Sequence, residues 1–306
     1  MFRLSTNRTT MLLIASLCAA HALAARAEEP MQVDLVQDLH WQDHHFVMTN
    51  WFYRHKGNDP AAQVRILAER GYDGVVLSLK DEPRRWRMLP AYLEALEEHG
   101  MTLTGIHTRF YVEDESYPEV VKQNLPLLEE TKALLIPSVG SRTNLSRTDP
   151  AVVERAAKIL REMSDDARRF GLGGVAMYTH VDAWVETSDD AIRAAKAADR
   201  RNVGTIFHLH HFQATNSTDL AGTLCRAKPY LMCVIIQGTD EDRATHKILG
   251  EGSFDMVPLV RTLREMDYRG PLGTMGFTQS GDIPGKLERA RKAWDAIKQE
   301  ALEREP

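Results

Sequence analysis

Short apolar segments alternate with longer amphipathic segments along most of this 306-residue chain. The apolar segments are rich in β-branched residues and carry few charges, which is typical of strands buried on both faces. Eight such segments predict strands at 46–52, 74–79, 101–107, 133–137, 174–180, 203–210, 231–236 and 273–277. The pattern therefore predicts a regular alternation of strands and helices.

Helix start and stop signals fall between the predicted strands. Asn58–Pro60 and Thr148–Pro150 predict helix starts, because a polar cap followed by proline suits the first turn. Thr187–Asp190 predicts another capped start, and Gly100 and Gly171 predict helix ends. The predicted helices cover 60–71, 83–99, 117–131, 150–171, 219–227 and 284–303. One further helix is predicted to start after Thr187, and another is predicted to end near Tyr268.

Eight strands that alternate with helices predict a single-domain α/β protein with a (β/α)8 TIM barrel. An open, doubly wound parallel sheet is the main alternative. No glycine-rich fingerprint follows the first predicted strand. The sequence therefore lends no support to a dinucleotide-binding fold, and we expect no nucleotide cofactor.

The N-terminal segment differs from the rest of the chain. Two arginines precede an apolar run at 11–20, and Ala25-Arg-Ala27 follows as a small-x-small cleavage pattern. This arrangement predicts a secretory signal peptide at 1–27, which leaves 28–306 as the barrel domain. We therefore expect a periplasmic or secreted protein.

The charge of the mature chain limits its partners. Removing residues 1–27 takes away three arginines and no acids, which moves the formal net charge from −5 to −8. An acidic protein is poorly suited to gripping phosphate backbones, so nucleic acid is not an expected partner. No other apolar segment reaches transmembrane length, so we expect no membrane association after signal removal. The oligomeric state stays open.

The most unusual segment is Asn202–Phe212. It begins as a predicted buried strand and ends with three histidines, His208, His210 and His211. Alternate side chains of a strand share a face, so His208 and His210 are expected to point the same way. One satisfied core histidine and two polar loop residues would explain the pattern without a function. Each buried ring nitrogen needs a partner, however, and three imidazoles exceed what packing requires. We therefore expect these side chains to line a pocket.

Polar and aromatic residues also follow the other predicted strands. Active sites of (β/α)8 barrels lie at the carboxyl ends of the strands, so these residues are candidates for the site. They are Trp51, Lys80, His107, Tyr178, His180, Gln237 and Gln279. Structural explanations exist as well: Lys80 could form a solvated pair with Asp81, His107 could be a core histidine, and Trp51 could be either a core residue or a platform for a sugar face.

Three segments resemble the xylose isomerase-like TIM barrel superfamily, which contains sugar phosphate isomerases and epimerases and shares its fold with endonuclease IV. Leu249–Asp255 resembles the family's segment between strands seven and eight, and Tyr268–Pro271 resembles its lead into strand eight. Asn202–His211 resembles its strand six. The order of elements agrees over nearly the whole mature chain. The resemblance implies the barrel fold and sugar isomerase or epimerase chemistry.

The metal ligands that this resemblance implies are largely replaced. The family usually holds a divalent ion with Glu, Asp, His and Glu on strands five to eight. The matching positions here are Tyr178, His208, roughly Ile235 and roughly Gly276. His180 and His211 match two histidines that accompany this set, and they are the candidate metal ligands. Such an imidazole-rich site would suit Zn²⁺ or another transition ion such as Mn²⁺, and equally metal-free acid–base chemistry.

The expected function is that of an exported sugar isomerase or epimerase that abstracts a proton next to the carbonyl of a small carbohydrate, or catalyses a related elimination. His208 or His210 is expected to transfer the proton, and Lys80 to stabilise negative charge. Trp51, His107, Tyr178, Gln237 and Gln279 are expected to contact the substrate. A sugar-binding barrel without catalysis is the alternative, favoured by the missing carboxylates and disfavoured by the histidines. Nucleic-acid cleavage is disfavoured by the acidic charge and the export signal.

The signal-peptide prediction can be checked on protein recovered from the periplasm or medium. The mature N-terminus should lie near Glu28, because the small-x-small pattern ends at Ala27. N-terminal sequencing of exported material measures this directly. A chain that keeps Met1 and stays in the cytoplasm would contradict it.

Overall fold

The barrel is closed and all its strands are parallel. The structure is a computed structural model that describes residues 39–52, 59–215 and 217–303, so the predicted signal peptide at 1–27 lies outside the described residues. Strand order follows chain order, and the first strand pairs with the last. The strands are β1 His45–Met48, β2 Gly74–Ser78, β3 Thr102–Tyr111, β4 Leu134–Gly140, β5 Gly174–Met177, β6 Val203–His208, β7 Leu231–Ile236 and β8 Leu272–Thr274. The predicted (β/α)8 barrel is confirmed.

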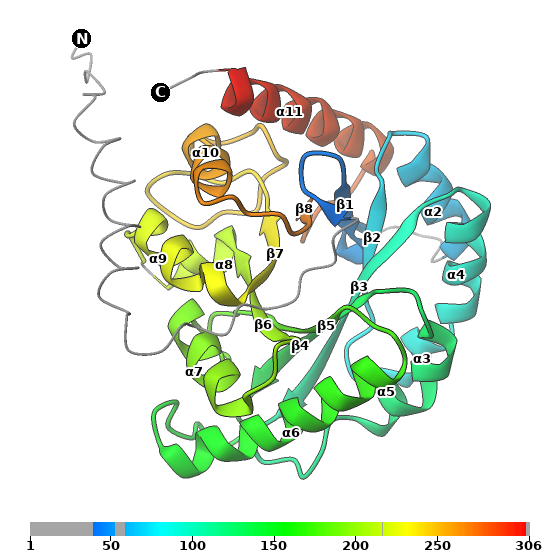
Figure 1. Ribbon diagram of the computed structural model, residues 1–306. Helices are drawn as coiled ribbons and strands as arrows, with labels where there is room; N and C mark the ends of the chain where they lie inside the picture. Colours follow the sequence, from blue (N-terminus) through cyan, green and yellow to red (C-terminus); the bar gives the residue numbers. More distant parts are fainter. Residues whose placement is uncertain (1–38, 53–58, 216, 304–306) are drawn as a thin grey trace.

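Helices surround the barrel on the outside (Figure 1). The α-helices are α2 Pro60–Ala68, α3 Pro83–Trp86, α4 Leu89–Glu98, α5 Glu119–Asn124, α6 Pro150–Arg169, α7 Ser188–Ala198, α8 Leu209–Ala214, α9 Leu220–Ala227, α10 Val257–Glu265 and α11 Ile283–Glu303. Short 3-10 turns are η2 Thr49–Phe52, η3 Leu125–Leu128 and η4 Lys228–Tyr230. Within the described ranges, no helix is both long and apolar enough to cross a bilayer.

Three helix starts form as their cap residues predict. The side chain of Asp59 accepts hydrogen bonds from the first turn of α2, and Asp149 accepts one from the backbone of Ala151 at 2.8 Å. Thr187 and Asp190 form a capping box at the start of α7. Each cap satisfies backbone N–H groups that have no partner within the helix, so these starts are specified locally.

Prolines interrupt two helices that the sequence analysis predicted as continuous. The predicted helix at 83–99 is split into α3 and α4, and Pro90 lies in the first turn of α4. The predicted helix at 117–131 is split into α5 and η3, with Pro126 in the first turn of η3. Proline lacks the backbone donor and clashes with the preceding turn, so a helix restarts at such a residue instead of continuing through it.

The predicted strand at 203–210 ends two residues early, and this changes the geometry of the site. Strand β6 stops at His208, and α8 begins at Leu209. The Nδ1 atom of His208 accepts a hydrogen bond from the backbone N–H of His211 at 3.4 Å, so His208 caps the helix. The expectation that His208 and His210 share one face of a strand is therefore wrong.

The long loop after β7 is held by an aspartate and by glycines. The carboxylate of Asp240 accepts from the Lys247 ammonium at 2.6 Å and from the backbone N–H of Ser253 at 3.2 Å. Gly252 has φ +98°, and a Cβ there would lie well inside contact distance of the Thr239 carbonyl oxygen. Glycine is needed at 252 for both reasons. Residues of the Leu249–Asp255 motif thus hold the loop after β7 in its fold.

Replacing Gly252 by alanine should destabilise the protein by about 2 kcal/mol or more, through the left-handed backbone and the contact with Thr239. Gly100→Ala is the matched control, because Gly100 also has a left-handed φ, +61°, but open space around it. It should cost only about 1 kcal/mol. Urea unfolding of both variants measures the difference. Equal losses would mean that the Thr239 contact contributes nothing.

Candidate active site

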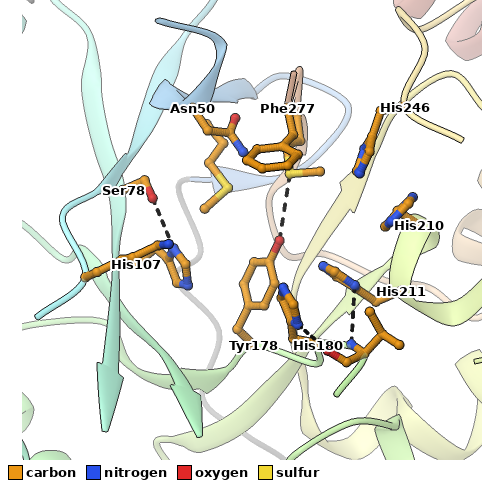
Figure 2. Close-up of a pocket in the computed structure, with 13 residues that line it drawn as sticks. Asn50, Ser78, His107, Tyr178, His180, His210, His211, His246 and Phe277 are labelled. Carbon is orange, nitrogen blue, oxygen red and sulfur yellow. Dashed lines mark hydrogen bonds between the residues drawn. The ribbon is translucent and has the colours of Figure 1, made fainter. Parts of the chain in front are cut away.

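A cavity of about 260 Å³ lies at the carboxyl ends of the strands. Figure 2 shows its lining, with β2 and β3 side chains on one side and imidazoles on the other. The lining residues are Met48, Asn50, Ser78, Lys80, His107, Tyr178, His180, Val181, His210, His211, His246, Met275 and Phe277. The described structure therefore brings residues from strands throughout the barrel to one cavity.

The histidines pack ring against ring. The ring centroids of His180 and His211 lie 4.1 Å apart, and those of His208 and His211 lie 4.6 Å apart. His210 stacks on His246 with centroids at 3.8 Å, and it lies 5.1 Å from His211. His246 was missed by the sequence analysis. It comes from the loop after β7, and its position just before the Leu249–Asp255 motif was the only local signal.

The peptide groups of Val181 assign opposite tautomers to two neighbouring imidazoles. The Nδ1 atom of His180 lies 2.5 Å from the Val181 carbonyl oxygen, which can only accept, so the proton of neutral His180 is on Nδ1. The backbone N–H of Val181 donates to Nδ1 of His211 at 3.4 Å, so the proton of neutral His211 is on Nε2. His180 thus offers a lone pair at Nε2, and His211 offers an N–H donor.

Burial keeps this imidazole cluster neutral at physiological pH. Loss of solvation, with neighbouring histidines adding to it, lowers the pKa of His211 to about 2 and that of His210 to about 4. Loss of solvation also lowers the pKa of His208 and His246, and it lowers the pKa of His180 although part of that side chain is exposed to solvent. Neutral imidazoles can each accept one hydrogen bond or proton and donate another.

The opposite side of the cavity is built on β2 and β3. His107 is held through both ring nitrogens, with Nδ1 at 3.1 Å from the Ser78 hydroxyl and Nε2 at 2.8 Å from the Ser138 hydroxyl. Burial lowers the pKa of His107 to about 3. Lys80 follows β2 with φ +52°, and its backbone N–H donates to the His107 carbonyl at 2.7 Å. These bonds explain how a non-glycine residue keeps a left-handed backbone there.

Tyr178 lies between the two sides (Figure 2). Its ring centroid is 4.7 Å from that of His107 and 5.6 Å from that of His211. Its hydroxyl donates to the sulfur of Met275 at 3.8 Å, and a thioether is a weak acceptor. A ligand oxygen would be a stronger acceptor for this hydroxyl than the thioether is.

Six predicted site residues line the cavity and four do not. Those that line it are Lys80, His107, Tyr178, His180, His210 and His211. Trp51 is fully buried in the core, and Gln279 lies outside the cavity, where it binds Lys286. Gln237 and His208 are buried outside the lining, and neither the Gln237 amide nor Nε2 of His208 has a hydrogen-bond partner in the described part of the chain.

The cavity does not fit the carboxylate metal site that the resemblance implies. The positions at which it implies glutamates hold Tyr178 and Gly276, and a Cβ at Gly276 would overlap the indole of Trp51. His211 could bind an ion through Nε2 only with its proton on Nδ1, facing the N–H of Val181. Among the described side chains, no three His, Cys, Asp or Glu could hold a metal ion together. The predicted zinc or manganese stays a prediction, which elemental analysis of the purified protein tests.

The neutral cluster predicts an acid-sensitive stability. His211 has a folded pKa of about 2 against about 6.5 unfolded, so the unfolded chain binds more protons below pH 6.5. Stability is then fully present above pH 6.5 and is lost as the pH falls. Urea unfolding between pH 7.5 and 5.5 should show this loss, and His211→Asn should show less of it. His99→Asn, which changes the exposed histidine directly after α4, is the control that should keep the wild-type slope. Equal slopes in all three proteins would refute the prediction.

The sequence is similar to that of proteins with the same barrel fold. The profile of the xylose isomerase-like TIM barrel family matches residues 64–299. An inosose isomerase of Bacillus velezensis is 22% identical over 232 residues, which cover 67% of this chain and 79% of that protein.

Solved structures show the same fold. D-psicose 3-epimerase from Clostridium cellulolyticum H10, solved with D-tagatose, superposes with a TM-score of 0.65 at 15% identity and covers 85% of this chain and 100% of its own. A xylose isomerase-like barrel protein from Mycobacterium smegmatis, solved in complex with magnesium, has a TM-score of 0.60 at 18% identity, with 85% and 97% covered. Another neighbour holds a zinc atom, with a TM-score of 0.63 at 14% identity and 85% and 100% covered. The chain therefore belongs to the xylose isomerase-like TIM barrel family.

Proposed function

We propose that the protein is a sugar isomerase or epimerase that moves a proton at the carbon next to a sugar carbonyl. Its relatives include an inosose isomerase and a psicose epimerase, which supports this class of enzyme. The cavity of about 260 Å³ has the size of a single sugar unit and lies where barrel enzymes carry their active sites. Export of the mature chain is part of the same proposal and rests on the N-terminal sequence.

The paired tautomers of His180 and His211 carry the proposal. Proton abstraction next to a carbonyl needs a base for the C–H proton and a donor for the oxygen that gains charge. The lone pair at Nε2 of His180 supplies the base, and the N–H at Nε2 of His211 supplies the donor. Their rings are 4.1 Å apart, so one substrate can meet both groups.

The proton and the electron pair of the broken C–H bond are both accounted for in this step. The C–H bond breaks, its proton moves to Nε2 of His180, and the electron pair forms a C–C double bond as the carbonyl becomes an enolate oxygen. The His211 N–H and the Tyr178 hydroxyl stabilise that oxygen by hydrogen bonds. Isomerisation follows when the hydroxyl proton on the deprotonated carbon moves to the former carbonyl oxygen and His180 returns its proton to the former carbonyl carbon. Epimerisation would need a second proton donor on the face of the carbon opposite His180.

The roles of His208 and His210 differ from those that the sequence analysis expected. His208 does not line the cavity, and it caps α8 and contacts His211 from behind. His210 lines the cavity, but its Nδ1 atom is buried and a backbone hydrogen bond with Thr245 engages the ring. In this proposal both histidines pack against His211 and position it, and neither transfers the proton.

A sugar-binding barrel without catalysis is the second candidate. One observation favours it: Tyr178 and Gly276 stand where the family resemblance implies metal-binding carboxylates. Phe277 and Tyr178 would then serve as apolar surfaces for a sugar face, and Phe277 is 41% exposed at the cavity.

Deuterium incorporation from heavy water separates the two functions. The purified protein should exchange the hydrogen next to the carbonyl of at least one sugar in a panel that contains neutral ketohexoses, such as D-tagatose and D-allulose, and acidic or phosphorylated sugars. Proton NMR follows the exchange. His180→Gln should lower the exchange rate by roughly 10²–10⁴-fold, because it removes the base. His211→Asn should lower it by about 10²-fold, because it removes an oxygen donor.

His99→Gln, which changes an exposed histidine far from the cavity, is the control and should exchange at the wild-type rate. Wild-type protein that binds these sugars without exchange would support the binding function instead. Unchanged exchange in the His180 variant would rule out the assigned base.

A further inference from the structure

Two cationic residues belong to the β2–β3 side of the barrel mouth, opposite the histidines, and one of them, Lys80, lines the cavity. The peptide of Lys80 is fixed by the bond to the His107 carbonyl and by the Trp86 indole, which donates to the Lys80 carbonyl at 2.9 Å. Arg109 lies two residues after His107 on β3, so the alternation of the strand puts it on the same inward face, closer to the mouth.

Neither cation forms an ion pair with an acidic side chain in the parts of the chain that the structure describes. Nearby cations are paired: Arg85 binds Glu82 at 2.7 Å, and Arg142 binds Asp114 at 2.7 Å. No ion pair or side-chain hydrogen bond joins Lys80 or Arg109 to a described residue, and none of the described lining residues is an Asp or a Glu. Asp81 and Glu82 act on Lys80 only through space and raise its pKa less than burial and the neighbouring arginines lower it. The β2–β3 side of the mouth therefore carries positive charge that no described ion pair neutralises.

The two charges act on each other and on the site. Burial lowers the pKa of the Lys80 ammonium, and the Arg109 guanidinium lowers it further. Arg109 also contributes to lowering the pKa of His107 and His180, after burial. The positive charge of Arg109 thus lowers pKa values on both sides of the cavity. An anion between Arg109 and Lys80 would offset the repulsion between these two cations.

We infer that the substrate carries an anionic substituent, a carboxylate or a phosphate, which binds between Lys80 and Arg109 while its carbonyl end faces His180 and His211. This inference rests on the proposed function and names its substrate class: an acidic or phosphorylated monosaccharide rather than a neutral one. The guanidinium fork of Arg109 matches two oxygens of either anion, and Lys80 adds a point charge. A cavity of about 260 Å³ leaves room for one sugar unit.

Binding of sugars that differ only at C6 tests the inference. Titration calorimetry with the purified protein compares D-glucuronate and D-glucose 6-phosphate with D-glucose, and D-galacturonate with D-galactose. At least one acidic sugar should bind about tenfold more tightly than its neutral counterpart, because it adds charge-assisted hydrogen bonds. The carboxylate and phosphate arms identify which anion the site takes.

Substitutions of the two cations should remove this preference. Arg109→Gln and Lys80→Met should each bring the affinity ratio close to one, and Arg109→Lys should keep part of it, because a point charge remains without the fork. Arg142→Gln is the matched control: it removes an exposed cation that is paired with Asp114, and it should leave the ratio unchanged.

The outcomes separate this inference from the proposed function. If no acidic sugar binds more tightly than its neutral counterpart, or if the ratio survives both substitutions, the inference is wrong. Deuterium exchange is then measured on the same sugars. Neutral sugars that exchange as well as acidic ones overturn only the inference, and acidic sugars that bind tightly without exchange overturn only the proposed chemistry.

Discussion

Closure of the barrel by parallel pairing of β1 with β8 is the constraint on which the rest of the structure depends. Phe46 pairs with Gly273, so strands from the two ends of the described chain become neighbours. Because every strand runs in the same direction, all carboxyl ends meet at one mouth. Met48 and Met275 then line the same cavity although the whole barrel separates them in sequence. The site exists only because this closure holds.

Within that mouth, the backbone of Val181 gives two histidine side chains different tautomers and therefore different roles. Histidine alone does not say which ring nitrogen is a base and which is a donor; the hydrogen bond at the other nitrogen decides it. Val181 presents a carbonyl to His180 and an N–H to His211, and the two rings become a base and a donor. Partial loss of solvation lowers the pKa of both rings and keeps them neutral, which is the state in which one ring can accept a proton while the other donates one.

The cavity is also polarised from side to side. Lys80 follows β2 and Arg109 belongs to β3, so positive charge comes from that side. The imidazoles of His180, His210, His211 and His246 come from the segments after β5, β6 and β7 (Figure 2). Family members that use carboxylates and a metal ion place negative charge at the ends of β5 and β8, where this chain has Tyr178 and Gly276. The chain thus keeps the barrel and changes the charge of its mouth, so a negatively charged ligand would meet attraction there.

The sequence by itself determined the barrel and its helix starts. Apolar periodicity set the number and order of the strands, and Asp59 and Thr187 set helix starts, because burial patterns and caps depend on residues within a turn or two. Only the tertiary structure decided that β6 ends at His208, that His246 joins the cluster and that Trp51 belongs to the core. These outcomes depend on which distant segments supply hydrogen bonds and packing at one place, and local periodicity carries no information about partners that lie far away along the chain.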